Sequence, residues 1–406
     1  MHYQKIILEK LLDKFEERKE GSHRRVLISC RKKEVNLPDM ESTEYRVFVE
    51  EMQKMKSERL IDLDWIRENY IINNIWLNLE NVSHAYQILN RETPEQKTEK
   101  AVRLIDATIS KIQTKWIKEG LQEDKSLLLE KNKLFGIWKQ PEHLRTEFLK
   151  ALCYIDKLAE NTITMRACSI QLYSDSKYFE HEIKKHLVSW IRKHEPIFRD
   201  MPDVDELEER EILDYIGILM MPEIFEFCGN ICIEFSEGMT DFSPMKSGSC
   251  IMANCVSDIQ HIRLNGIKKI LFIENRTNYA EYCLKEKTPE ELVVYHGGFY
   301  SPEHGRFFQK IYTSAGQISS YFWADIDYGG FQMYHRLKNN IIPNLQPYRM
   351  DTQTFYAHCS HGLLRSETYI KKVAGLLKQS DFSVFHEVIQ LILQEKKTIE
   401  QETFLI

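Results

Sequence analysis

Two aspartates spaced two residues apart, Asp325 and Asp327, follow an apolar run in "YFWADIDYGGFQMYHRLK", residues 321–338. Charge buried at the end of a strand without a partner is costly, so such a pair normally has a cation, hydrogen-bond donors or solvent beside it. Carboxylate oxygens are the ligands that Mg²⁺ prefers, and Mg²⁺ can stabilise the oxygens of a phosphodiester during its cleavage. The pair therefore predicts a divalent-cation site, provided that further acidic residues join it.

The elements that must position these aspartates follow from the pattern after residue 250, where short apolar runs alternate with helical segments. This alternation predicts a parallel sheet covered by helices on both faces. The predicted strands are residues 268–275, 291–298 and 320–327. Because right-handed crossovers bring the carboxyl ends of such strands to one edge, we expect the ligand there.

Acidic residues stand at several of these strand ends. Glu274 ends the first predicted strand, Asp325 and Asp327 end the third, and Asp351 in "PYRMDTQTF" follows a possible fourth. The two-residue period of a strand places Trp323, Asp325 and Asp327 on one side. The sequence thus predicts a crevice with three or four carboxylates. The competing interpretation is a structural carboxylate network satisfied by backbone N–H groups.

His296 lies in the "HGGF" turn that ends the second predicted strand. It is a candidate for a phosphate contact. A histidine beside two glycines is at least as often a residue that makes local hydrogen bonds.

Composition limits the number of domains, the kind of partner and the cellular compartment. With 406 residues, 43% of them hydrophobic, the chain is long enough for two or three domains. A formal charge of -6 means that any anionic partner must meet local basic patches. The nine cysteines and the absence of a signal-peptide pattern or a long apolar run predict a cytoplasmic protein with reduced thiols.

One basic patch lies near the N-terminus. Residues 1–35 contain ten Lys and Arg against six Asp and Glu, a local charge of +4. Arg24, Arg25, Lys32 and Lys33 flank the apolar run there, and we predict that they contact DNA phosphates. Amphipathic helices with short strands between them are compatible with a winged helix. An ordinary solvated surface explains the same charges equally well. Farther on, residues 96–135 predict one long helix, and residues 143–195 are mostly helical.

The segments "ILFIENRTNY", "HGGF" and "YFWADIDYGGFQMYHRLK" resemble a Toprim domain, in which a glutamate ends the first strand and a DxD motif ends the third. With the following "RMDTQTF", they are similar more narrowly to the C-terminal domain of the JetD family, the nuclease subunits of Wadjet defence systems. The resemblance covers roughly residues 225–400. Over residues 1–120 it is a more general likeness to the winged-helix domain of that family.

This resemblance implies an α/β protein with three parts, similar to the A subunit of topoisomerase VI. The parts are a winged-helix DNA-binding domain (1–120), a helical connector (121–224) and a Toprim catalytic domain with a Rossmann-like parallel sheet (225–406). It also implies a homodimer that cleaves double-stranded DNA with Mg²⁺ or Mn²⁺ in defence against plasmids and phages. The implied partners are an SMC-like ATPase with kleisin-type and kite-type subunits, and no membrane is involved.

Carried over residue by residue, Glu274 takes the Toprim glutamate position, as metal ligand or general acid/base. Asp325 and Asp327 take the metal-binding DxD positions, and Asp351 takes the Met-Asp position of a further metal ligand. Many relatives carry Thr-His-Gly after the second aspartate where this chain has Tyr328-Gly329-Gly330. No side-chain role is therefore transferred to positions 328 and 329.

Three other functions fit parts of the sequence. Strand transfer of the topoisomerase type would need a nucleophilic tyrosine, for which Tyr45, Tyr70 and Tyr86 lie in the right part of the chain. A phosphatase of the haloacid dehalogenase type also has a strand followed by DxD, but with a longer sequence after it than the 79 residues (406 minus 327) that follow Asp327 here. A non-catalytic subunit that binds DNA and recruits partners would use the acidic crevice only for structure.

Overall fold

The computed structural model describes residues 2–18, 25–32, 34–159 and 161–405. The chain divides into two compact units. The first contains residues 1–106 and 124–139, and the second contains residues 107–123 and 140–406. The second unit holds all of the predicted acidic residues.

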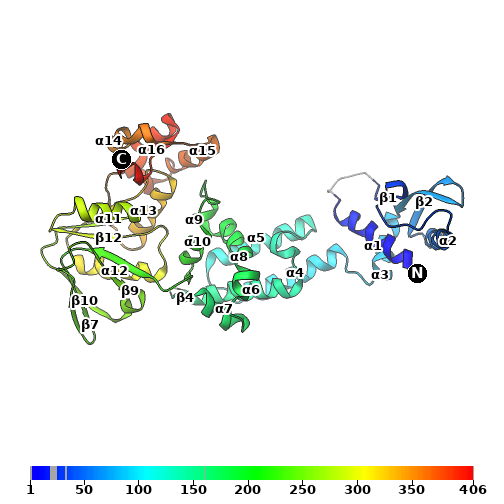
Figure 1. Cartoon of the computed structure of the whole chain (residues 1–406), viewed down its shortest axis with the longest axis horizontal. Helices are drawn as coiled ribbons and strands as arrows, with labels where there is room; N and C mark the ends of the chain where they lie inside the picture. Colours follow the sequence, from blue (N-terminus) through cyan, green and yellow to red (C-terminus); the bar gives the residue numbers. More distant parts are fainter. Residues whose placement is uncertain (1, 19–24, 33, 160, 406) are drawn as a thin grey trace. The chain divides into compact units, whose positions relative to one another are not determined.

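The first unit begins with helices packed against a small antiparallel sheet (Figure 1). Its strands run in the order β1-β3-β2. The elements are α1 (His2–Glu16), β1 (Leu27–Ser29), α2 (Thr43–Ser57), β2 (Ile61–Arg67), β3 (Ile71–Leu77) and α3 (Val82–Ile88). The apolar stripes predicted for both helices are confirmed, because Ile7 and Leu11 of α1 and Phe48 and Met52 of α2 are fully buried in one core.

Helices dominate the middle of the sequence. They are α4 (Pro94–Ile109), α5 (Lys115–Lys131), α6 (Glu142–Leu158), α7 (Met165–Tyr173), α8 (Lys184–His194), α9 (Pro196–Arg199) and α10 (Glu209–Tyr215). The prediction of one helix over 96–135 is wrong, since α4 ends at Ile109. The carboxylate of Asp156 accepts hydrogen bonds from the amides of Gln113 at 2.9 Å and Thr114 at 2.6 Å. These bonds hold the amides that precede α5 and stabilise the break.

The sheet of the second unit has the strand order β14-β13-β11-β12-β6-β9. Its strands are β6 (Ile224–Cys228), β9 (Ser249–Met252), β11 (Lys269–Ile273), β12 (Glu291–Tyr295), β13 (Ser319–Trp323) and β14 (Gln346–Pro347). Strands β14, β13, β11 and β12 are parallel as predicted, whereas β6 and β9 are antiparallel, so the sheet is mixed. Ile273 pairs with both Tyr295 and Trp323, so the three central strands end level with one another.

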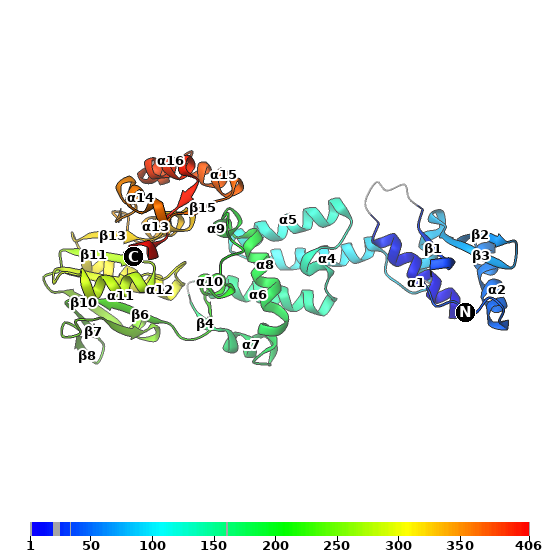
Figure 2. The ribbon, with the colours of Figure 1, turned by 45° about the horizontal axis from the view of Figure 1, so that its top comes forward.

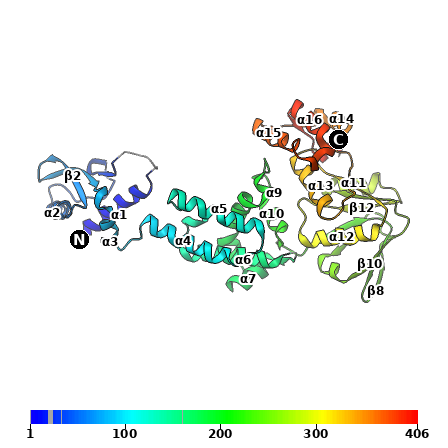
Figure 3. The same cartoon turned by 180° about the vertical axis from the view of Figure 1, so that it is seen from behind.

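Helices cover both faces of this sheet. Phe272 contacts Phe308 of α12 (Pro302–Ala315) with ring centroids 5.2 Å apart. Lys269, on the opposite face, contacts Tyr282 of α11 (Arg276–Lys285). Helix α12 also packs against β10 (Ile259–Leu264), which forms a second antiparallel sheet with β7 (Ile231–Phe235) and β8 (Gly238–Asp241) (Figure 3).

After the DxD motif the chain forms α13 (Tyr328–Asn340) and then a group of helices that lie together in Figure 2, namely α14 (Thr352–His358), α15 (Glu367–Leu376) and α16 (His386–Glu395). The short strands β15 (Leu363–Leu364) and β16 (Lys397–Thr398) pair antiparallel. Residues after β16 return to the sheet, where Ile399 forms a β-bridge with Ile326.

The short strands β4 (Ile163–Thr164) and β5 (Ile218–Leu219) pair in parallel. Within the described part of the chain, no helix combines the length and the apolar character that crossing a membrane requires. The nine cysteines, all of them in that part, are free thiols.

Candidate metal centre

The three predicted site carboxylates lie just beyond the level ends of β11 and β13. Glu274 directly follows β11, and its N–H donates a hydrogen bond to Trp323 O at 2.9 Å. Strand β13 ends at Trp323, so the predicted strand alternation does not reach the aspartates. Asp325 lies in the loop, and Asp327 is the N-cap of α13. All three side chains are partly buried.

The His-Gly-Gly turn after β12 contributes through its backbone. Gly297 and Gly298 have φ values of +62° and +47°, in the left-handed region that glycine adopts without strain. The amide of Gly298 donates a hydrogen bond to the Glu274 carboxylate. The two glycines therefore let a backbone donor turn toward the acid.

A second pair of glycines, Gly329 and Gly330, follows the DxD motif, and the surroundings of Gly330 show why glycine is needed there. The Asp327 side chain accepts a hydrogen bond from the Gly330 amide at 2.7 Å, which caps α13. A Cβ at position 330 would lie 2.1 Å from the carbonyl oxygen of Asp325, so only glycine fits there without a backbone shift. A Cβ at position 329 would meet Asp327 Oδ1 at an ordinary 3.5 Å. Gly330 thus permits the tight turn that follows the DxD motif.

The three carboxylates are close enough for their charges to interact. Burial, together with the charges of Asp327, Glu211 and Glu402, raises the pKa of Glu274 to about 7. Burial and the charges of Asp327 and Glu274 raise the pKa of Asp325 well above its usual range. Burial also raises the pKa of Asp327, against the hydrogen bond from Gly330 and the charge of Arg365. Each carboxylate therefore holds its negative charge at a cost in this environment.

Residues that the sequence analysis did not single out surround this group. Glu402 accepts a hydrogen bond from Asn275 Nδ2 at 2.6 Å, and Gln401 donates its backbone N–H to Asp325 Oδ1 at the same distance. Arg365 is held by Thr398 Oγ1 at 2.7 Å and by Asp203, and its positive charge lowers the pKa of Asp327. The site thus combines an acidic cluster with one arginine.

The donor set fits a hard divalent cation by its chemistry, because carboxylate oxygens are the preferred ligands and a cation would offset the repulsion between them. As the side chains stand, however, no three His, Cys, Asp or Glu residues in the described ranges surround a common point closely enough to hold a metal ion. Binding would therefore require the carboxylates to rotate toward one another.

Two predicted site residues have other surroundings. Asp351 is exposed and is the N-cap of α14, where its side chain accepts a hydrogen bond from Thr354 N at 2.8 Å. The ring of His296 is 0% exposed and stacks on Phe308, with centroids 5.2 Å apart. Burial lowers the pKa of His296 well below its usual value, so the ring is neutral. A phosphate cannot reach it in this arrangement, and the predicted DNA contact of His296 is not supported.

The predicted basic residues of the first unit are described only in part. Arg24 and Lys33 lie outside the described residues, and Lys32 ends the short helix Cys30–Lys32. Arg25 is exposed, and its guanidinium lies 4.8 Å from the centre of the Trp76 ring. This cation–π contact leaves the charge accessible to an anion.

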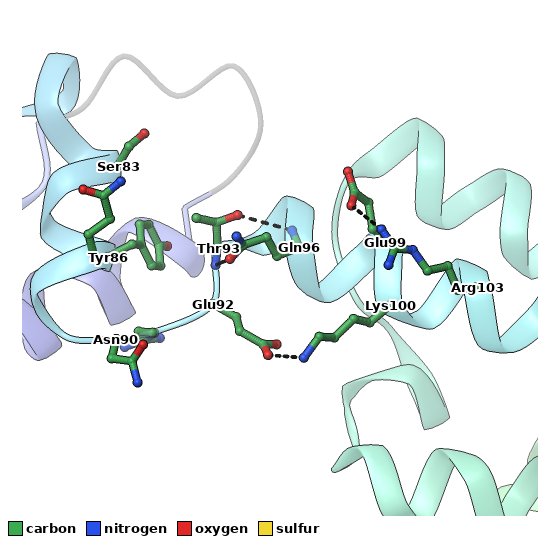
Figure 4. Close-up of a pocket in the computed structure, with 11 residues that line it drawn as sticks. Ser83, Tyr86, Asn90, Glu92, Thr93, Gln96, Glu99, Lys100 and Arg103 are labelled. Atoms are coloured by element: carbon green, nitrogen blue, oxygen red, sulfur yellow. Dashed lines mark hydrogen bonds and ion pairs between the residues drawn. The ribbon is translucent and has the colours of Figure 1, made fainter.

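A cavity of about 650 Å³ lies between α3 and the start of α4 in the same unit (Figure 4). Its basic residues are matched by acids. Lys100 pairs with Glu92, and Arg103 pairs with Glu99 at 3.4 Å. Arg91 pairs with Asp13 at 2.7 Å. The cavity therefore has little excess charge with which to attract a phosphate.

Comparison with known proteins relates the acidic site to a family. Residues 243–406 match the family model described as "Wadjet protein JetD, C-terminal". This part of the chain is therefore similar to the JetD C-terminal family. The Wadjet protein JetD of Bacillus cereus (strain Q1) is 26% identical over 418 residues, which cover 100% of this chain and 99% of that protein. The resemblance indicated by the sequence motifs is thereby confirmed, and it extends along the whole chain.

The JetD C-terminal match includes Glu274, Asp325 and Asp327 as well as the residues that the sequence analysis missed. Arg365, Gln401 and Glu402 lie 38 or more positions after Asp327, in segments without a recognisable motif. The acidic sequence around Gln401 and Glu402, "TIEQET", is a weak signal on its own. Only the fold brings them to the strand ends.

Proposed function

We propose that this chain is a divalent-metal-dependent endodeoxyribonuclease and the nuclease subunit of a Wadjet-type defence complex. The observation that carries the proposal is the convergence of three carboxylates at the level ends of β11 and β13, where the charge of Asp327 raises the pKa of both Glu274 and Asp325. Similarity to a Wadjet protein along the full chain supports the biological setting.

The proposal includes the finer architecture. The order α1, β1, α2, β2, β3 and the sheet β1-β3-β2 are those expected of a winged helix, with α2 and the β2–β3 hairpin available to DNA. The parallel strands that carry Glu274 and the two aspartates are those expected of a Toprim domain. Two such chains in a homodimer would provide one acidic site for each strand of a duplex.

In the proposed reaction, Glu274, Asp325 and Asp327 hold the cation. Bound Mg²⁺ or Mn²⁺ would lower the pKa of a water nucleophile and stabilise the leaving oxygen of the phosphodiester. In the absence of a cation the pKa of Glu274 is raised to about 7, so binding of a cation by this carboxylate would release a proton near neutral pH. Arg365, which lies near Asp327, supplies a positive charge for a non-bridging phosphate oxygen.

The proposed partners follow from the same setting. Double-stranded DNA would be held by phosphate contacts, with Arg25 as the described residue best placed for one. An SMC-like ATPase with kleisin-type and kite-type subunits would deliver the DNA and license cleavage.

The test is cleavage of circular plasmid DNA by the purified protein, alone and with its neighbouring operon products, in Mg²⁺ or Mn²⁺. We expect metal-dependent nicking or linearisation that Asp325→Ala and Glu274→Ala each reduce by at least about 100-fold. An intact plasmid with the complete set of partners, or full activity in both variants, would contradict the proposal and favour a recruiting subunit.

Topoisomerase-like strand transfer is the alternative enzyme function. Of its three candidate nucleophiles, Tyr45 and Tyr86 are each 3% exposed and their hydroxyls are engaged by Ile72 N and Glu16. Tyr70, at the β2–β3 turn, is 42% exposed. Denaturing the products of the cleavage reaction decides between the two chemistries, because strand transfer leaves DNA covalently attached to protein and hydrolysis does not.

A further inference from the structure

The segment formed by residues 397–405 returns from the C-terminal helices to the acidic site. Ile399 pairs with Ile326, the residue between the two aspartates, through two backbone hydrogen bonds: Ile326 N to Ile399 O at 2.8 Å and Ile399 N to Ile326 O at 3.3 Å. The DxD backbone is therefore held from outside the sheet, by a segment more than 70 residues later in the chain.

Gln401 of this segment is fully buried and makes hydrogen bonds to both strand ends. On the β13 side, its N–H donates to Asp325 Oδ1 at 2.6 Å, and its side-chain Nε2 donates to Trp323 O at 3.3 Å. On the β11 side, its Oε1 accepts from Asn275 N at 2.9 Å, and its carbonyl accepts from Asn278 Nδ2 at 2.8 Å. One residue thus links the loop that carries Asp325 to the turn that follows Glu274.

This arrangement also explains the residues after Glu274 in the motif "IENRTNY". Asn275 caps α11 by accepting hydrogen bonds from the amides of Thr277 and Asn278, while its own amide binds Gln401. Asn278 is 2% exposed and turns its Nδ2 toward the Gln401 carbonyl. Both asparagines therefore connect α11 to residues 397–405.

We propose that Gln401 is a positioning residue of the metal centre, which fixes the Asp325 carboxylate and its distance from Glu274 so that both can serve one cation. This role rests on the proposed function, because it assumes that the carboxylates bind a divalent metal. Hydrogen bonds to ligating side chains orient them before binding, and their loss typically lowers metal affinity or activity by about 10–100-fold. The backbone N–H of Gln401 meets this description at Asp325, and the Gln401 side chain holds that N–H in place through its bonds to Trp323 O and Asn275 N.

A purely structural role predicts a different result. If Gln401 only satisfied buried backbone groups, its removal would lower the melting temperature without changing the affinity of the remaining folded protein for a cation. A positioning role predicts weaker cation binding in folded protein. The readout that separates the two is therefore metal binding by protein that is shown to be folded.

The experiment compares wild type with Gln401→Ala, using Thr403→Ala as the matched control. Thr403 is buried in the same short helix, Gln401–Leu405, and its hydroxyl donates to Glu400 O at 2.8 Å within the segment. Binding of Mn²⁺ is measured by electron paramagnetic resonance, the metal-free melting temperature by calorimetry, and plasmid cleavage as a function of Mn²⁺ concentration. Gln401→Ala keeps the backbone N–H that binds Asp325 but loses the side-chain bonds to Trp323 O and Asn275 N that hold this N–H between the two strand ends. We therefore expect it to need about 10-fold more Mn²⁺ for half-saturation, the lower end of the range for a lost hydrogen bond to a ligand, and to recover cleavage at high Mn²⁺. Thr403→Ala should bind Mn²⁺ as wild type does.

Asn278→Ala provides a second variant in case Gln401→Ala does not fold. It removes the hydrogen bond to the Gln401 carbonyl from α11 and leaves the other bonds of Gln401 in place, so we expect a smaller shift of Mn²⁺ affinity in the same direction. Wild-type affinity in folded Gln401→Ala, or in Asn278→Ala when the first variant is unfolded, would overturn the positioning role while leaving the nuclease proposal intact. A wild type that neither binds Mn²⁺ nor cleaves DNA would overturn the proposed function itself.

Discussion

Glu223, outside the proposed metal centre, has a carboxyl group whose burial favours the protonated, uncharged form. Burial, followed by the charges of Asp214 and Glu303, raises its pKa to about 7. The Ser301 hydroxyl, which donates to Glu223 Oε2 at 2.5 Å, and the charge of Arg210 oppose this rise. A carboxyl with a raised pKa contributes most stability when protonated, below about pH 4.5, and this contribution is lost as the pH rises to about 7. We predict that Glu223→Gln, which keeps an acceptor for Ser301, melts about 1–3 °C above wild type at pH 8 and not above it at pH 4.5.

Thermal melts of both proteins across this pH range provide the test. Glu234→Gln is a suitable control, because Glu234 is a partly exposed residue of β7 that pairs with Arg263 at 3.1 Å. Its effect on the melting temperature should have the same sign at both ends of the range. A difference between Glu223→Gln and wild type that does not grow with pH would show that the carboxyl is not protonated in the folded protein near neutral pH.

At the scale of elements, Asp351 has a helix-capping role in the structure, whereas the sequence motif predicted a metal ligand. Its side chain accepts the Thr354 amide at the start of α14, a role that asparagine fills as well as aspartate. We predict that Asp351→Asn keeps wild-type stability, Mn²⁺ affinity and cleavage, whereas Asp351→Ala loses about 1 kcal/mol of unfolding free energy. Calorimetry and Mn²⁺ titration of the two variants measure both properties. A clear loss of Mn²⁺ affinity in Asp351→Asn would instead restore the ligand role that the sequence motif predicted.

The elements also explain which parts of the site the sequence could predict. Glu274 and the two aspartates stand directly after short apolar strands, and the parallel arrangement of those strands follows from the intervening helices, so local patterns were sufficient. The end of β13 at Trp323 was not predictable, because it depends on the turn that Gly330 permits and on pairing with Ile399. Gln401 and Arg365 were missed because their contacts with the site join residues far apart in sequence. His296 was misjudged because burial among aromatic rings is a property of the packed fold.

At the scale of the whole molecule, charge distribution sets how DNA would be held. With a net charge of -6 and an acidic cluster at the proposed metal centre, the chain as a whole would repel a duplex, so binding would rely on basic residues in a local patch and on cations held by the carboxylates. Without a bound metal, the carboxylates would repel the phosphates of DNA. Repulsion of this kind would restrain cleavage until the duplex is delivered to the site. This is consistent with a nuclease that depends on partner subunits.

Phosphate-dominated binding makes a quantitative prediction about salt. The logarithm of the association constant should fall linearly with the logarithm of salt concentration, by about 0.9 for each phosphate neutralised, and duplexes of unrelated sequence should behave alike. Arg25→Gln should reduce this slope by about 0.9 if, as proposed, the exposed guanidinium above Trp76 neutralises one phosphate. Arg103→Gln should leave the slope unchanged, because Arg103 is exposed but paired with Glu99. Fluorescence anisotropy with labelled duplexes measures the slopes. Binding that is insensitive to salt and discriminates strongly between sequences would mean that base contacts, not phosphate contacts, hold the DNA.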